Sequence, residues 1–153
     1  QIDLIVRSIC CLIPGVKGMS ENIRVRRLVD RYLEHSRVFV FNADGAKSVY
    51  LGSADWMNRN IYRRIEVCFP IFDPVIQRDL LTCIDLQLAD NTQAVLLTTD
   101  LENHWIGDEV AIETANQKST SGTSRRQAQL DIYQYFSKMA RKNIASGANK
   151  LKK

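Results

Sequence analysis

The sequence predicts a layered α/β domain, and three observations support this prediction. Short β-branched and aromatic runs alternate with longer segments whose apolar residues recur at helical spacing. The tetrapeptide "NADG", residues 42–45, separates two of the short runs, as expected for a β-hairpin. Asp73 followed by Pro74 has the form of a helix start, with a capping side chain before a proline. A chain of 153 residues, 45% of them apolar, is long enough to bury one core.

The first part of the chain is expected to contain a strand, a loop and a helix. Residues 2–8 are nearly continuous in apolar side chains, which is typical of a buried parallel strand. Residues 10–18 contain Pro14 and two glycines and are expected to form a loop. Ser20 can cap a helix that runs to about Glu34. The inner face of that helix would consist of Val25, Leu28, Val29, Tyr32 and Leu33.

The middle of the chain is expected to contain strands and one amphipathic helix. Two short strands are predicted at 38–41 and 48–52, on either side of the turn, and another at 63–71. The helix that begins at Asp73 is expected to continue to about Asp90. Its apolar side chains recur every four residues, at Ile76, Leu80, Ile84 and Leu88.

The last third is expected to contain a strand, an excursion and a helix. Residues 92–98 have the composition of a short strand. Residues 100–124 are polar, acidic and rich in Ser, Thr and Gly, which favours a long excursion or a flexible loop. A final helix is predicted from near Arg125 to about Lys142. Its inward side chains would be Ala128, Ile132, Tyr135, Phe136 and Met139.

Charge is unevenly distributed along the chain. Residues 1–71 hold eleven basic and seven acidic side chains, and nine of the basic ones are arginine. Residues 72–124 hold two basic and nine acidic side chains, and residues 125–153 hold eight basic and one acidic. Because a guanidinium group can grip phosphate oxygens with two hydrogen bonds at once, the arginine-rich part points to a phosphate ligand. The C-terminal lysines are interpreted as a solvated tail.

Composition also excludes several classes of protein. The sequence has no apolar stretch long enough for a membrane span and no signal segment. The four cysteines include no C-x-x-C pair, so we expect reduced, mostly buried thiols in a cytoplasmic protein and no zinc site. A strand at the very start, with no preceding turn, suggests a piece of a longer polypeptide.

His35 is the candidate for phosphate chemistry, because histidine can act near neutral pH as a nucleophile, a general acid or a cation. The alternative is that His35 closes the C-terminal end of the predicted helix, where a positive charge is favoured. Arg37 lies two positions on, on the same face of an extended segment. Arg7 would stand at the C-terminal end of a core strand, where open α/β sheets gather their ligands.

A second cluster follows the segment "GSAD", residues 52–55, which offers a tight backbone and a hydroxyl donor. Arg59, Arg63 and Arg64 lie just beyond it; for each arginine taken singly, surface solvation is the alternative. Trp56 and Met57 are interpreted as packing residues. His104, in the acidic segment, is interpreted as structural.

Three blocks carry a family resemblance: "SENIRVR" at 20–26, "LEHSR" at 33–37 and "SADWM" at 53–57. With the stretches 1–91 and 124–136 around them, they resemble the C-terminal region of bacterial polyphosphate kinase of the long, multi-domain type. Phospholipase D-like domains carry an H-x-K motif followed by G-S-x-N. Here the motifs are His35-Ser36-Arg37 and Gly52-Ser53-Ala54-Asp55, with arginine for lysine and aspartate for asparagine.

The resemblance implies a phospholipase D-like mixed sheet flanked by helices, present as a partial domain. Residues 1–97 would form the phosphate-binding core and 98–124 a polar loop or insert. Residues 125–142 would form a helix of the same domain and 143–153 a basic tail. The implied activity is a reversible transfer of the terminal phosphate of ATP to inorganic polyphosphate, through a phosphohistidine and with magnesium. The phosphohistidine and the Mg²⁺ ligands are expected in a preceding domain.

The resemblance also assigns roles to individual residues. Arg7 resembles an arginine that contacts the phosphates of the nucleotide. His35 resembles the second active-site histidine, which touches ATP and assists transfer as an acid or a charge partner. Arg64 resembles an arginine that lines the same phosphate site. His35 and Arg64 are therefore the catalytic candidates, and Arg7, His35 and Arg37 the nucleotide-binding candidates, with no metal ligand in this chain.

The implied partners are ATP, ADP and polyphosphate, the upstream domains of the same polypeptide, and further copies in a homo-oligomer of the full-length enzyme. No nucleic-acid partner is expected, and the implied location is cytoplasmic, with at most a peripheral association with the inner membrane. Two alternatives remain open. One is a phospholipase D-like phosphodiesterase or nuclease half-site, against which Arg37 and Asp55 argue. The other is a polyanion-binding module that uses the basic segment 125–153, although that segment has no aromatic residue after Phe136.

Overall fold

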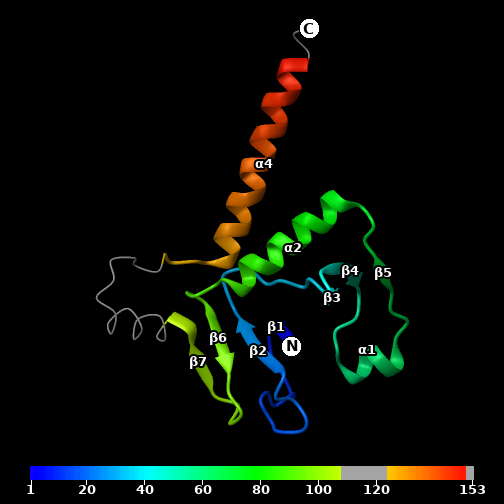
Figure 1. Cartoon of the computed structure of the whole chain (residues 1–153), viewed down its shortest axis with the longest axis vertical. Helices are drawn as coiled ribbons and strands as arrows, with labels where there is room; N and C mark the ends of the chain where they lie inside the picture. The colour runs from blue at the N-terminus through cyan, green and yellow to red at the C-terminus, as the bar shows by residue number, and fades with distance from the viewer. Residues whose placement is uncertain (108–123, 151–153) are drawn as a thin grey trace. The chain divides into compact units, whose positions relative to one another are not determined.

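The computed structural model describes residues 1–107 and 124–150, with side chains to residue 144 (Figure 1). The chain forms two compact units. Unit 1 consists of residues 1–33 and the chain from residue 85 onward, and unit 2 consists of residues 34–84. Within the described residues, no helix is both long and apolar enough to cross a membrane.

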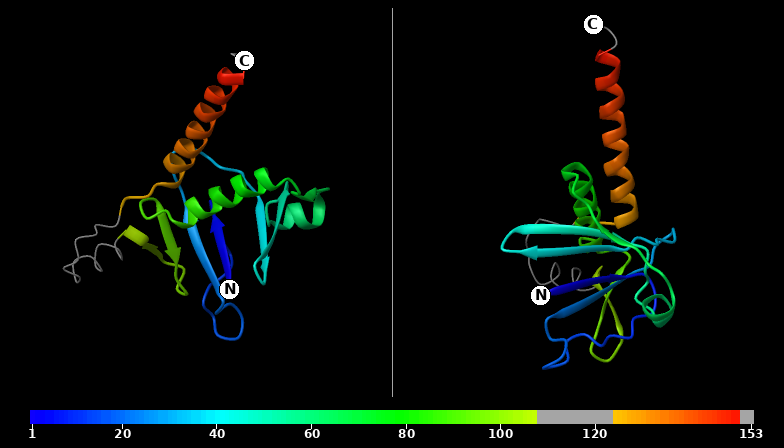
Figure 2. Two further views of the ribbon diagram at one scale, coloured as in Figure 1. Left: turned by 45° about the horizontal axis from the view of Figure 1, so that its top comes forward. Right: turned by 90° about the vertical axis from the view of Figure 1, so that its right-hand side faces the viewer.

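Unit 1 contains a four-stranded mixed sheet with the order β1-β2-β6-β7 (Figures 1 and 2). Strand β1 (Ile2–Val6) pairs in parallel with β2 (Ile23–Leu28). Strand β6 (Ala94–Leu97) pairs antiparallel with both β2 and β7 (Asn103–Trp105). The predicted first strand and its parallel pairing are confirmed, as is the strand predicted at 92–98. β1 lies at the sheet edge and is only half-buried.

The helix predicted from Ser20 to Glu34 is wrong, because this segment contains strand β2. Val25 and Leu28, at helical spacing, are buried at 1% and 3% exposure. However, β2 pairs with a strand on each side, and this pairing overrides the weak helical pattern. The supposed inner-face residues at the end of the pattern are exposed: Val29 at 46%, Tyr32 at 64% and Leu33 at 66%.

Ser20 closes the loop before β2 instead of capping a helix. Its hydroxyl donates to the carbonyl of Ile13 at 2.6 Å and accepts the N–H of Val16 at 3.0 Å. Its carbonyl accepts the N–H of Gly15, which has a φ of +75°. A buried hydroxyl with both partners satisfied therefore sets the shape of residues 13–20.

The core of unit 1 lies where β2, β6 and the C-terminal helix α4 (Ala128–Lys150) meet. Leu28, Ala94 and Ala128 form one buried cluster, and Ile5 and Ile106 pack against it. α4 begins with the fully buried Ala128, whose small side chain allows a close approach to the sheet. The core is small, so polar contacts contribute much to the placement of α4.

Asp90 supplies the main polar contacts of unit 1 and is fully buried. One carboxylate oxygen accepts the N–H groups of Thr92, Gln93 and Ala94 at 2.7–3.1 Å. The other accepts the N–H of Ala128, the first residue of α4, at 2.7 Å. Asp90 therefore joins the start of β6 to the start of α4, and it satisfies backbone donors that would otherwise lack partners.

Unit 2 contains a three-stranded antiparallel sheet with the order β3-β4-β5. Its strands are β3 (Val38–Ala43), β4 (Ala46–Gly52) and β5 (Cys68–Pro70). The predicted hairpin is confirmed: Asp44 and Gly45 have φ values of 48° and 88°, as a type I′ turn requires.

The strand predicted at 63–71 is only partly correct. Helix α1 (Asn58–Arg63) ends at Arg63, which is the first residue of the predicted strand. Of the remaining residues only Cys68–Pro70 pairs with β4. Ile65, between them, is fully exposed and has no apolar neighbour to hold it in a strand.

Helix α2 (Pro74–Leu88) begins where it was predicted. The Asp73 carboxylate accepts the N–H groups of Val75 and Ile76 at 2.8 and 3.0 Å, which satisfies two donors of the first turn. No residue of α2 is fully buried, so its predicted inner face is only partly covered.

Three further expectations need correction. The last helix begins at Ala128 and extends to Lys150, so the segment predicted as a tail from 143 is largely helical. Phe136, which was predicted to face inward on this helix, is 43% exposed. The predicted loop 100–124 contains strand β7, whose pairing with β6 supplies its backbone partners, while residues 108–123 lie outside the described residues. The four cysteines are free, but Cys11 and Cys68 are exposed instead of buried.

We expect Asp90→Ala to destabilise the folded chain by about 3 kcal/mol or more, because it leaves several buried backbone donors without acceptors. Asp90→Asn keeps one acceptor oxygen and should cost roughly half as much. The measurement is urea unfolding followed by circular dichroism.

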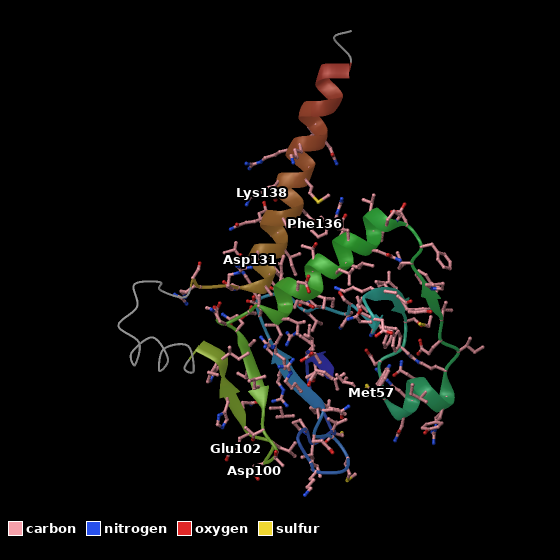
Figure 3. All side chains as sticks on the ribbon, in the orientation of Figure 1. Met57, Asp100, Glu102, Asp131, Phe136 and Lys138 are labelled. Carbon is pink, nitrogen blue, oxygen red and sulfur yellow. The ribbon has the colours of Figure 1, made fainter. Side chains whose placement is uncertain are left out.

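Asp100→Ala is the matched control, in the exposed turn between β6 and β7 (Figure 3). It should change the free energy of unfolding by less than about 0.5 kcal/mol. Equal effects of the Asp90 and Asp100 substitutions would contradict the structural role of Asp90.

Candidate functional site

The candidate site of unit 2 lies where the loop after β4 meets the strands of its sheet. The N–H of Gly52 donates to the carbonyl of Arg37 at 3.0 Å, and the N–H of Ser53 donates to the carbonyl of Val67 at 2.9 Å. These bonds continue the sheet pairing beyond β4 and fix the "GSAD" segment against the segments that carry Arg37 and Glu66.

Arg37 is paired with Asp55 across this site. Its Nε and Nη2 atoms donate to the same carboxylate oxygen at 2.9 and 2.6 Å. The two positions at which the chain differs from the H-x-K and G-S-x-N motifs therefore contact each other. A lysine could not form this two-donor contact, and an asparagine could not form an ion pair.

Glu66 is held beside this pair by two neutral donors. The Ser53 hydroxyl donates to Oε2 of Glu66, and Nδ2 of Asn60 donates to Oε1 at 2.7 Å. The same Ser53 hydroxyl accepts the N–H of Val67 at 3.0 Å. Asn60 is buried, at 3% exposure, so it forms a fixed support for the carboxylate.

The pKa of Glu66 lies below its ordinary value of 4.5. The largest causes are the hydrogen bonds from Ser53 and then Asn60, and the positive charges of Arg64 and Arg37 add to them. Both guanidinium groups therefore act on one carboxylate, which places Arg64 and Arg37 in the same part of unit 2.

Arg64 and His35 are exposed and available to a ligand. Arg64 follows α1 in an extended conformation. His35 lies in a segment without regular secondary structure before β3, and no described residue forms a hydrogen bond or ion pair with its side chain. The alternative that His35 closes a helix end is wrong, because residues 20–34 contain no helix.

Arg7 belongs to unit 1 and follows β1 directly, which confirms its position at the end of a strand, but β1 is an edge strand and not a core strand as predicted. Its side chain is half-buried, and its Nε atom is buried without a hydrogen-bond partner among the described residues. A buried guanidinium donor without a partner is costly, and Nε of Arg27 is in the same state. The convergence of Arg7 with the residues of unit 2 stays a prediction.

Sequence reasoning missed Glu66 and Asn60. Their roles come from hydrogen bonds across a loop, which residue spacing does not reveal. The available signal was a single acid in the otherwise basic stretch that contains Arg63 and Arg64.

Trp56 does not pack in the interior as predicted. Its ring stacks on Phe39 with centroids 5.9 Å apart, but 77% of the residue is exposed. Met57, labelled in Figure 3 at the start of α1, is 52% exposed. The packing prediction fails because no segment of unit 2 covers the outer side of this loop.

Comparisons with known proteins match this fold and these motifs. The family model described as "Polyphosphate kinase C-terminal domain 2" matches residues 1–117. The chain belongs to the polyphosphate kinase family. The polyphosphate kinase of Burkholderia ambifaria (strain MC40-6) is 43% identical over 137 residues, which is 89% of this chain and 18% of that protein. The one from Synechocystis sp. is 52% identical over 100 residues, or 65% of this chain and 14% of that protein.

A solved structure gives the same result. The crystal structure of polyphosphate kinase from Porphyromonas gingivalis superposes with a TM-score of 0.78 at 41% identity and covers 93% of this chain. It confirms the predicted phospholipase D-like mixed α/β fold. The chain spans about a fifth of these relatives, 18% of the Burkholderia protein and 20% of the Porphyromonas chain.

We expect Arg37 and Asp55 to be energetically coupled. In a double-mutant cycle with Arg37→Ala and Asp55→Ala, the coupling should be about 1 kcal/mol, since the pair is only partly buried. Arg24 and Asp3 form the matched control, because they make a similar two-bond contact with a more exposed arginine. A coupling no larger than that of the control pair would contradict a fixed Arg37–Asp55 contact.

The lowered pKa of Glu66 predicts a pH effect on stability. Folding favours the carboxylate, so its contribution is present above the ordinary value of 4.5 and is lost as the pH falls through the lowered pKa. Glu66→Gln should therefore lose less stability than the parent chain between about pH 5.5 and pH 3. Urea midpoints at a series of pH values measure this, and parallel curves for parent and variant would contradict it.

Proposed function

We propose that this chain is the C-terminal part of an enzyme that reversibly transfers the terminal phosphate of ATP to inorganic polyphosphate. In this proposal it supplies phosphate-binding side chains, whereas the phosphohistidine is supplied by the rest of the polypeptide. The observation that carries the proposal is the state of Arg7, His35 and Arg64. None of these side chains has a hydrogen bond or ion pair within the described residues.

The contrast with other arginines supports this choice. All three arginines of β2 are engaged: Arg24 with Asp3, Arg26 with backbone carbonyls at the end of α2, and Arg27 with Asn103. A phosphate chain carries a negative charge on each unit, so its site needs cations that are not already neutralised. Arg7 and Arg64 have no hydrogen bond or ion pair among the described residues, although the positive charge of Arg64 also helps to lower the pKa of Glu66.

In phosphoryl transfer a protein contributes mainly by positioning the reactants and neutralising their charge. In the proposal, the guanidinium groups of Arg7 and Arg64 bind phosphate oxygens and His35 acts as an acid or charge partner. Arg37 fits phosphate binding less well than the others because its Nε and Nη2 atoms already donate to Asp55. Its pairing instead holds the backbone that leads from His35 into β3.

Magnesium is implied by the family resemblance. Among the described residues, no group of three or more His, Cys, Asp or Glu side chains could hold a metal ion. In the proposal, as the resemblance implies, the Mg²⁺ ligands lie in the rest of the polypeptide. The proposal also includes assembly of the full-length enzyme into a homo-oligomer.

A phosphodiesterase half-site is less well supported. That chemistry is associated with the H-x-K and G-S-x-N residues. Here the lysine and the final asparagine of these motifs are replaced by Arg37 and Asp55, which form an ion pair. Diester hydrolysis by the purified chain would favour this second candidate.

In the full-length enzyme, His35→Ala and Arg64→Ala should each lower kcat about 10- to 100-fold. This corresponds to a lost charge-assisted contact of roughly 1.5–3 kcal/mol. Both side chains are exposed, so the thermal midpoint should not change. The measurement is steady-state synthesis of polyphosphate from ATP.

Arg24→Ala is the control, because Arg24 is an exposed arginine engaged with Asp3. It should leave turnover close to normal. Near-normal turnover of both the His35 and Arg64 variants would defeat the site assignment.

A further inference from the structure

Unit 2 has little buried apolar core and a large exposed apolar surface. Within residues 34–84, all of which the structure describes, Val49 is the only buried apolar side chain. A segment of this size is marginal with so small a core. Between the G-S-A-D motif and α2, large apolar residues are exposed instead: Trp56, Met57, Ile61, Tyr62, Ile65, Val67, Phe69 and Phe72.

One face of the β3-β4-β5 sheet contributes to this surface. Phe39 lies opposite Tyr50 in the hairpin register, and Phe41 contacts Tyr50 edge-on at 5.9 Å. Trp56 stacks on Phe39 from the loop. These side chains line an open cavity of about 410 Å³, together with Gly52, Ala54, Glu66, Val67 and Cys68. We call this lining the aromatic face.

The chemistry of the aromatic face selects an apolar occupant. Its one charged member is Glu66, and the carboxylate of Glu66 already accepts hydrogen bonds from Ser53 and Asn60. A polar ligand would find few free donors or acceptors there. Contiguous apolar surface of this kind is typical of a protein–protein contact.

We propose that the aromatic face is the surface on which the rest of the polyphosphate kinase polypeptide docks. The inference rests on the proposed function, since that function requires residues from outside this chain. About four-fifths of each relative lies outside the matched segment, because the chain covers 18% of the Burkholderia protein and 20% of the Porphyromonas chain. An intramolecular partner of that length is available at high effective concentration whether or not the enzyme assembles into an oligomer.

The position of the aromatic face gives the docking a consequence for the reaction. Gly52, Ala54 and Glu66 line the cavity, and Ser53 and Asp55 alternate with them in the polar network beside it. A docked segment would therefore exclude water next to the Arg37–Asp55 pair. Lower local dielectric strengthens charge interactions, so docking would also strengthen this ion pair, which holds the backbone that leads from His35 into β3.

Hydroxyl-radical footprinting of the full-length enzyme and of the 153-residue chain tests the proposal. The rate of side-chain oxidation reports exposure, and Trp56 and Phe41 are exposed at 77% and 63%. In the full-length enzyme we expect both rates to fall at least fivefold. Tyr133 on α4, 71% exposed, serves as the reference outside unit 2.

Equal oxidation rates of Trp56 and Phe41 in the two proteins would overturn the proposal. Protection that develops in the 153-residue chain as its concentration rises would also overturn it, because the occupant would then be a second copy.

Substitutions in the full-length enzyme provide a second readout. Trp56→Glu should restore oxidation of Phe41 and lower activity more than tenfold, whereas Trp56→Phe should retain protection and activity. Ile144→Glu, at an exposed position of α4, is the control and should change neither. Protection of Phe41 that persists in Trp56→Glu would overturn the docking surface.

The two proposals fail separately. If the phosphate-site assignment is wrong, His35→Ala and Arg64→Ala will have normal turnover while Trp56 and Phe41 remain protected from oxidation. If the docking proposal is wrong, the aromatic face will be unprotected while those two variants are still impaired.

Discussion

The buried carboxylate of Asp90 organises the larger unit of this structure. It accepts N–H groups from the start of β6 and from the start of α4, two places far apart in the sequence. Arg26 on β2 donates to the carbonyls of Leu88 and Asp90 from the other side. Burial lowers the pKa of Arg26, yet a guanidinium remains charged at neutral pH, so these bonds are charge-assisted. With only a small apolar cluster available, the polar contacts determine where β6 and α4 meet β2, and the sheet that presents Arg7 depends on that arrangement.

The fold was predictable from the sequence wherever local chemistry decides structure. The Asp44-Gly45 turn requires positive φ at both residues, and the Asp73-Pro74 pair caps a helix with its own side chain, so both were recognised. β2 was not, because Val25 and Leu28 fit a helical period as well as they fit a strand between two neighbours. The extent of α4 was also missed, since the polar, basic sequence after Lys142 has no apolar period by which to predict a helix.

The candidate site, like the fold, could be predicted from the sequence only in part. The positions of Arg7, His35, Arg37 and Arg64 follow from motif resemblance, and the structure adds that His35 and Arg64 are exposed. The engagement of Arg37 by Asp55 and the support of Glu66 by Asn60 could not be predicted, because they arise where a loop folds back on a sheet. The prediction that Trp56 and Met57 are packing residues fails for a related reason: sequence shows that a side chain is apolar but not what covers it.

The contact between residues 37 and 55 also constrains how such a sequence can change over time. Moving between the lysine–asparagine and arginine–aspartate pairs requires two substitutions. A change to arginine alone leaves a charged donor facing a neutral amide, and a change to aspartate alone leaves an ion pair with a single nitrogen donor. Only the two changes together give the contact seen here, in which two guanidinium nitrogens donate to one carboxylate oxygen.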